Sequence, residues 1–208
     1  MMIKKLKLGL LILCMPVMAF ASQFQNGEQY TELQTEKTSK PQVIEFFSYF
    51  CGHCYKMEPI AKSIEKSLPA GVPFIKSHVN FLPGKSTAEQ SNLSYAYLIA
   101  KQQAKEHQVS DALFNYIHRQ KATFSNMKEV SNLLALNGVS KEEFDSLLSS
   151  MSVILGEKEM VEAQNKYSKA GALTGVPTFI VNGKYKINVN KLRSQAELDS
   201  LIAFLLNK

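Results

Sequence analysis

The feature that most constrains the fold is a β-rich apolar run that leads directly into two cysteines and then into a helical pattern. Residues 43–50 (VIEFFSYF) are rich in β-branched and aromatic side chains, which predicts a buried strand. Residues 51–67 follow with helical content, and residues 72–81 (VPFIKSHVNF) have the pattern of a second strand. A strand, a helix and a strand in so short a stretch predict a βαβ unit with parallel strands and a right-handed crossover.

The middle of the chain has the pattern of successive helices. Ser110 is expected to cap one helix, and residues 126–129 and 140–143 have the spacing of capping boxes. A further polar helix is expected over about 157–170. Residues 84–167 are therefore interpreted as a helical insertion.

The C-terminal part predicts a hairpin and a final helix. Residues 177–181 (PTFIV) and 185–189 flank Asn182-Gly183, a strong hairpin signal. Ser194 begins a further capping box, and apolar residues follow it at helical spacing. The order βαβ, helices, ββα predicts the α/β class, as a thioredoxin-like fold with an inserted all-helical domain. The fold would be built from residues 22–83 and 168–208, on either side of the insertion.

The N-terminus predicts a signal peptide over residues 1–21. Three lysines precede an apolar run over residues 8–18, and residues 19–21 (AFA) match a signal peptidase site. The run is short for a bilayer span, so a cleaved signal is favoured over a retained membrane anchor. Cys14 lies inside the run and would be discarded with it.

Composition excludes one class of partner. The net charge is +6, and it falls to about +3 without the three signal-peptide lysines. No block of Lys and Arg stands out, so no nucleic acid is expected as a partner.

The mature chain keeps only Cys51 and Cys54. A disulfide that closes so short a loop would add little stability. A zinc site would need two further ligands, and His78, His107 and His118 show no metal-binding spacing, so no metal is expected. A redox role is the remaining interpretation.

The position of the pair suits redox chemistry. A helix N-terminus presents free N–H groups and partial positive charge, which favour a thiolate at Cys51. His53 should stabilise that thiolate further. Cys54 lies one turn deeper and is expected to be the resolving thiol.

Two segments carry a resemblance to a known family. EFFSYFCGHCYKMEP resembles the active-site segment of the DsbA family of periplasmic disulfide oxidases, and GVPTFIVNGKY resembles that family's second signature. The likeness covers nearly the whole mature chain. It implies a periplasmic monomer that donates a Cys51–Cys54 disulfide to newly secreted, unfolded proteins with cysteine thiols. It also implies no further cofactor, and reoxidation by a quinone-linked membrane partner of the DsbB kind.

The resemblance assigns roles around the cysteines. Cys51 would be the exposed nucleophile, Cys54 its partner, and Val176-Pro177 a cis peptide facing the disulfide. Gly52, Val176 and Thr178 would contact substrate. The family's commonest motif has Pro where this chain has Gly52, which leaves the redox potential open.

The resemblance also places an acid beneath the site. That acid is Glu45, with Lys76 on the adjoining strand and Glu58 nearby. A carboxylate in an apolar strand must be paired or protonated. Glu45 is interpreted as a residue that tunes the redox site. The alternative is that Glu45 forms a purely structural pair with Lys76.

Two rival functions remain at this point. The first is a disulfide isomerase or reductase of the same fold, which Gly52 favours. The second is a peptide-binding chaperone in which the cysteine pair is incidental.

Overall fold

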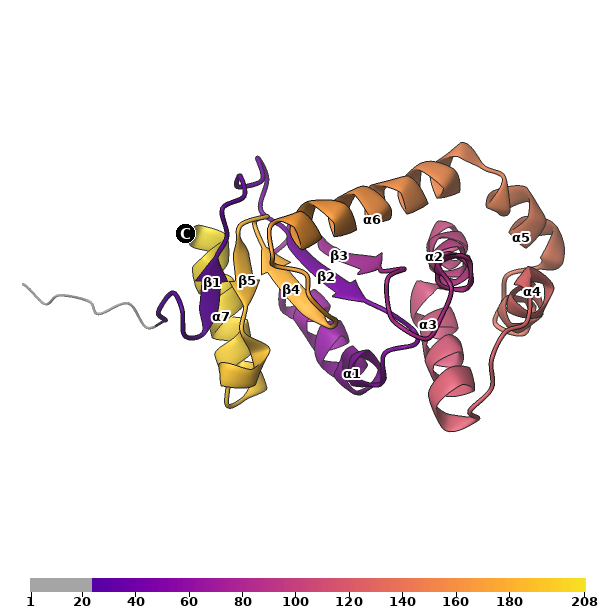
Figure 1. Ribbon diagram of the computed structural model, residues 1–208, viewed down its shortest axis with the longest axis horizontal. Coiled ribbons are helices and arrows are strands. Elements are labelled where there is room, and N and C mark those ends of the chain that lie inside the picture. Colours follow the sequence, from indigo (N-terminus) through magenta and orange to yellow (C-terminus); the bar gives the residue numbers. More distant parts are fainter. Residues whose placement is uncertain (1–23) are drawn as a thin grey trace, which may run out of the picture.

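The computed structural model describes residues 24–208, which form one five-stranded sheet and seven α-helices (Figure 1). The strands are β1 (Tyr30–Glu32), β2 (Val43–Phe47), β3 (Phe74–His78), β4 (Thr178–Val181) and β5 (Tyr185–Ile187). The helices are α1 (Gly52–Ser67), α2 (Thr87–Gln102), α3 (Glu106–Phe114), α4 (Met127–Ala135), α5 (Lys141–Leu148), α6 (Met151–Lys169) and α7 (Gln195–Asn207). A π-helical turn, Asn115–Arg119, continues α3, and a 3-10 turn, Val189–Lys191, follows β5.

The expected signal peptide, residues 1–21 with Cys14 inside it, lies outside the described residues. From residue 24 onward, no helix has the length and apolar character needed to cross a bilayer.

The sheet has the order β1-β5-β4-β2-β3. Strands β2 and β3 are parallel and α1 connects them, as the βαβ pattern predicts. Strand β4 runs antiparallel to both β2 and β5. The α/β class predicted from the sequence is therefore confirmed.

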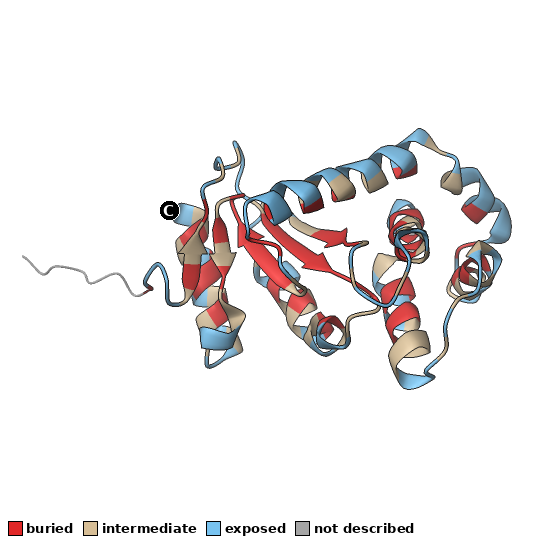
Figure 2. Cartoon of the chain, viewed as in Figure 1, coloured by how far each residue is buried: buried red, intermediate tan, exposed pale blue. Residues whose placement is uncertain are grey.

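Helices cover both faces of the sheet, so its central strands are buried throughout (Figure 2). Val43 and Phe179 pack in a cluster with residues of α1 and α7. Ile44 and Ile180 point to the other face, where they pack with the end of α6. This two-sided burial explains why residues 43–47 are apolar at every position except Glu45. It also means that Glu45, in the same strand, lies inside the protein.

Helices α2 to α6 lie beside the sheet and have a core of their own (Figure 1). This core joins the end of β2 through Phe47 and Tyr49, which contact Phe114 of α3. Helix α6 is long and runs from α5 back to the sheet (Figure 1). These helices occupy the stretch in which the sequence predicts the insertion.

Three of the predicted helix starts are confirmed. Ser140 and Glu143 form a complete capping box at α5. Asn126 and Ser194 accept hydrogen bonds from the third residues of α4 and α7, although neither box is reciprocal. Gly138 adopts a φ of 87° just beyond α4, which only glycine tolerates freely.

The hairpin between β4 and β5 was also predicted. Asn182 and Gly183 both have positive φ, 51° and 69°, and Val181 pairs with Tyr185. The buried Asn182 amide also donates to the last carbonyls of α7, at Leu205 and Leu206. The turn residue thus fixes the final helix as well as the hairpin.

Some expectations were wrong or incomplete. Ser110 does not cap a helix: it lies inside α3, buried, where its hydroxyl shares a 2.7 Å hydrogen bond with the Tyr49 hydroxyl. The polar helix begins at Met151 rather than near 157, because Ser150 caps it. Strand β1 was not anticipated, since its three residues are extended by pairing with β5.

Candidate active site

Cys51 lies where β2 ends and α1 begins. Its backbone is extended, with φ −88° and ψ 113°, and it caps α1 through its sulfur, which accepts a hydrogen bond from Cys54 N at 3.2 Å. A tight turn leads into this position, because Cys51 N donates to the Ser48 carbonyl at 3.0 Å. The sulfur therefore occupies the place that an oxygen acceptor normally takes at a helix N-cap.

The two thiols have opposite electrostatic environments. Hydrogen bonding from the Cys54 thiol, with backbone donors at Cys54 and His53 and the charge of His53, lowers the pKa of Cys51 to about 6 despite partial burial. Burial raises the pKa of the Cys54 thiol, and the hydrogen bond that this thiol donates to the Cys51 sulfur raises that pKa further. Cys51 is partly exposed, whereas Cys54 is 1% exposed. The pair therefore consists of an accessible thiolate and a protected thiol.

The loop before β4 faces Cys51. The Val176–Pro177 peptide bond is cis, as predicted, and the Cys51 thiol donates to the Val176 carbonyl oxygen at 3.3 Å. The Thr178 side chain is buried and donates to the Gly175 carbonyl at 2.8 Å. That hydroxyl is already bonded, so it holds the loop in place.

Two carboxylates and one lysine are buried beneath the cysteines. Lys76 Nζ lies 2.5 Å from Glu58 Oε2 and 3.3 Å from Glu45 Oε2. Burial alone would lower the pKa of Lys76, but the charges of Glu45 and Glu58 outweigh it and raise the pKa. The sequence placed Lys76 with Glu45, whereas the structure makes Glu58 its closer partner.

Glu45 is the less satisfied of the two acids. It is fully buried, and neither carboxylate oxygen has a hydrogen-bond partner. Burial raises the pKa of Glu45 to about 7, with Lys76 opposing the shift and Glu58 adding to it. This carboxyl can therefore take up and release a proton near neutral pH.

Two histidines of this region, His53 and His78, have different surroundings. His53 is exposed, beside the cysteines. His78 is fully enclosed: its Nε2 accepts from Tyr49 N at 3.1 Å and its Nδ1 bonds Ser94. Burial lowers the pKa of His78 to about 3, so it is a neutral core residue.

His118 is the residue that sequence reasoning missed. Its Nε2 donates to the Tyr49 carbonyl at 2.8 Å, and its ring stacks on Tyr55 at 5.2 Å. A side chain added at Gly52 would meet this ring at 3.9 Å. The sequence offered no local signal for this position, because the π-helical turn after α3 brings His118 to the start of α1.

A groove of about 720 Å³ opens next to the cysteines. The start of α1, the cis-proline loop and the segment after β5 line it, with Val176, Pro177 and Thr178 among the lining residues. Gly52 does not line the groove and lies on the side of His118 instead. Nowhere in residues 24–208 do three His, Cys, Asp or Glu side chains gather to hold a metal ion.

Comparison with known proteins identifies the family. The DSBA-like thioredoxin domain matches residues 42–203, which include both cysteines, the cis-proline loop and the helical segment. The chain belongs to this family. It is therefore a thiol:disulfide oxidoreductase of thioredoxin-like fold.

Relatives within the DsbA family cover most of the chain. The thiol:disulfide interchange protein DsbA of Escherichia coli K12 is 35% identical over 188 residues, which are 89% of this chain and 86% of that protein. DsbA of Pectobacterium carotovorum is 32% identical over an alignment of 216 positions, which covers 99% of each chain.

Solved structures agree with this assignment. Proteus mirabilis DsbA, determined with a non-covalently bound peptide PWATCDS, superposes with a TM-score of 0.78 at 26% identity, over 90% of this chain and 100% of that chain. Pseudomonas aeruginosa DsbA has a TM-score of 0.74 at 29% identity, over 90% of this chain and 95% of that chain.

Proposed function

We propose that the protein is a periplasmic disulfide oxidase that donates a Cys51–Cys54 disulfide to newly secreted proteins. The observation that carries this proposal is the contrast between the two thiols: the pKa of Cys51 is lowered to about 6, whereas that of buried Cys54 is raised. A stabilised thiolate favours the reduced enzyme, and so makes the disulfide form an oxidant, an effect for which DsbA itself is the standard example.

The exchange takes two steps. A substrate thiolate attacks the Cys51 sulfur, the Cys51–Cys54 bond breaks, and the Cys54 sulfur leaves with the electron pair and gains a proton. A second substrate thiolate then attacks the substrate sulfur of the mixed disulfide, and Cys51 leaves as its stabilised thiolate. The substrate loses two electrons and becomes a disulfide, and the enzyme becomes a dithiol.

Several surrounding residues have proposed roles. His53 stabilises the Cys51 thiolate, and the pKa of Cys51 already reflects its charge. Val176 and Pro177 line the groove beside Cys51 and are proposed to receive the substrate backbone. Thr178 supports that loop, and Gly52, which has no side chain, is proposed to let the substrate backbone approach the start of α1 beside His118.

The setting is proposed from family membership and the sequence of the N-terminus. Residues 1–21 act as a cleaved signal peptide, and the mature protein works as a monomer in the periplasm. It needs no cofactor besides its own disulfide. A quinone-linked membrane protein of the DsbB kind reoxidises it, and substrate proteins contribute the cysteines that it oxidises.

A stoichiometric oxidation assay tests the proposed function. The disulfide form is expected to convert an equal amount of a reduced two-cysteine peptide to its disulfide, and the dithiol form should convert none. A chaperone with an incidental cysteine pair would bind the peptide equally in both forms without oxidising it. An isomerase would instead rearrange a mispaired protein faster in its dithiol form.

Glu45→Gln should slow resolution and abolish a pH dependence centred near 7. The negative charge of Glu45 raises the pKa of Cys54, so removal of the charge alone would ease the deprotonation of Cys54 and speed reoxidation. If the carboxylate instead exchanges a proton with Cys54, the Gln variant should reoxidise roughly a hundredfold more slowly, the low end of general-base effects. Stopped-flow reoxidation from pH 5 to 8 distinguishes the two cases. A faster variant, or an unchanged pH profile, would leave Glu45 with a structural role only.

Gly52→Pro should make the protein more oxidising. Gly52 is the first residue of α1, where proline is well accommodated, and a Cβ there meets only ordinary contacts. Proline would hold the donors of His53 and Cys54 more rigidly around the Cys51 thiolate. We expect a rise of up to about 30 mV, equivalent to roughly 1.4 kcal/mol. Equilibration with glutathione measures it, with Gly52→Ala as the control, and a shift toward reducing potential would contradict this account.

A further inference from the structure

The groove beside Cys51 has an apolar floor. The apolar residues that line it come from α1, the cis-proline loop, the end of β5 and the 3-10 turn after it: Met57, Val176, Pro177, Ile187 and Val189. Its volume of about 720 Å³ is within the range of sites that hold small molecules or short peptide segments.

The rim of the groove is cationic. Lys56 comes from α1, Lys186 from β5 and Lys191 from the 3-10 turn after β5, and the exposed His53 lines the same groove. No aspartate or glutamate is among the described residues that line the groove. Segments far apart in the sequence thus bring three like charges to one opening.

These three lysines have no carboxylate partner within residues 24–208. Other lysines do: Lys62 is paired with Asp111, and Lys85 with Glu89. A cleft lined by one sign of charge raises the local concentration of ions of the opposite sign, and unpaired ammonium groups keep that charge available to a ligand. A groove with an apolar floor and a cationic rim therefore fits an anionic peptide segment.

We propose that this rim selects substrate segments that carry carboxylates beside their cysteine, and that Lys56, Lys186 and Lys191 are the specificity-determining residues. The inference rests on the proposed oxidase function and narrows its substrate class. The selection by the lysines takes place at the first step of the exchange, where a substrate thiolate attacks the disulfide form. At this step Cys51 carries no negative charge of its own. Apolar side chains of the segment lie on the floor, and its carboxylates face the rim.

The test uses dithiol peptides that differ only at the residues flanking the first cysteine, which are Glu, Gln or Lys. Second-order rates of oxidation by the disulfide form are measured by acid quench and chromatography. Each rate is divided by the rate of the same peptide with oxidised glutathione, which removes the effect of the flanking charge on the peptide's own thiol. The normalised rates should fall in the order Glu, Gln, Lys.

Each lysine should contribute a factor of about two to five to the ratio of the normalised oxidation rates of the Glu and Gln peptides, as exposed ion pairs do. The ratio should shrink in 1 M salt, where charges are screened beyond about 3 Å. Lys56→Gln, Lys186→Gln and Lys191→Gln should each lower it, and the triple variant should bring it close to one. If the triple variant is unfolded by circular dichroism, the three single variants carry the test.

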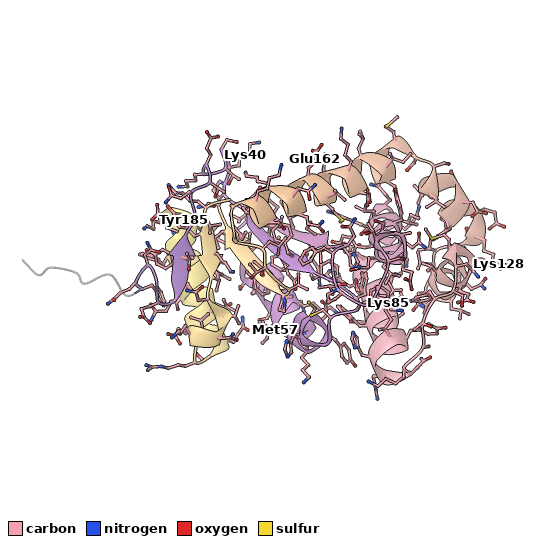
Figure 3. The ribbon with its side chains drawn as sticks, in the orientation of Figure 1. Lys40, Met57, Lys85, Lys128, Glu162 and Tyr185 are labelled. Carbon is pink, nitrogen blue, oxygen red and sulfur yellow. The ribbon has the colours of Figure 1, made fainter. Side chains whose placement is uncertain are left out.

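Lys128→Gln is the matched control. Lys128 is exposed on α4, at the far side of the helical part from Met57, which marks the groove (Figure 3). This variant should keep the full peptide ranking. The Cys51 titration, followed by thiolate absorbance, is recorded for every variant, so that an effect on the nucleophile is distinguished from an effect on the substrate.

Three outcomes would overturn the proposal. The first is a ranking in the triple variant equal to that of the parent protein. The second is an equal slowing of all peptides together with a raised pKa of Cys51, which would make the rim a thiolate-tuning device. The third is a flat ranking together with lysine-dependent sedimentation on phosphatidylglycerol vesicles, which would assign the rim to a membrane surface. If no peptide is oxidised at all, the proposed function itself fails.

Discussion

Cys54→Ser is expected to leave the protein covalently joined to its substrates. Cys51 is the partly exposed thiol with the lowered pKa, and Cys54 is the only other cysteine in residues 24–208. In this variant the Cys51 thiolate attacks a disulfide of a secreted protein, and one substrate sulfur leaves as a thiolate. Without Cys54 no internal thiol can then release the mixed disulfide, and no enzyme disulfide can form, so catalytic oxidation is lost completely. Adducts with secreted cysteine-containing proteins should appear as high-mass bands on non-reducing gels and disappear with reductant.

Cys51→Ser is the matched variant. It leaves Cys54, which is 1% exposed and has a raised pKa, so it should form no adducts. Both variants lose catalytic oxidation, and only the adducts distinguish them. Adducts that depend on Cys54, or equal alkylation of the two thiols in the reduced parent protein, would overturn the assignment of roles.

The second large effect is a shift of about three pH units in the titration of Cys51. The reduced protein should show a thiolate absorbance step with a midpoint near pH 6, against an ordinary value near 9, and no step for Cys54 below pH 9. Hydrogen bonding from the Cys54 thiol is the largest cause, so Cys54→Ala should move the midpoint upward. The backbone donors remain in that variant, which should keep its midpoint below 9. A midpoint above 8 in the parent protein would contradict the proposed mechanism.

The same shift makes the stability of the reduced form depend on pH. Between about pH 6 and 9 the folded protein holds Cys51 as a thiolate, whereas the unfolded chain binds a proton there. The free energy of unfolding of the reduced form should therefore rise with pH across this window, and this contribution is lost as the pH falls through 6. The disulfide form has neither thiol to titrate, so the reduced form should lose stability relative to the disulfide form from pH 7 to pH 5. Urea unfolding of the reduced and disulfide forms at each pH measures the two free energies of unfolding.

The sequence by itself determined the features that depend on neighbours along the chain. Local periodicity, caps and backbone preferences predicted a strand over 43–50, of which 43–47 forms, and the helix start at Cys51. They also predicted the Asn182-Gly183 turn and the cap at Ser140. The cysteine pair and its place between strand and helix were evident for the same reason. Ser110 was misread because a serine inside a helix and a serine at its cap look alike until its tertiary partner, Tyr49, is known.

Only the tertiary structure decided which distant residues share the site. Glu58 as the closer partner of Lys76, His118 beside Gly52, and the meeting of Lys56, Lys186 and Lys191 at one groove all join segments far apart in the chain. The difference in pKa between Cys51 and Cys54 also comes from packing, since burial and hydrogen-bond donors act in opposite directions on two thiols a single turn apart. Local patterns carry no information about such contacts, because the path of the chain through the sheet and helices decides which side chains meet.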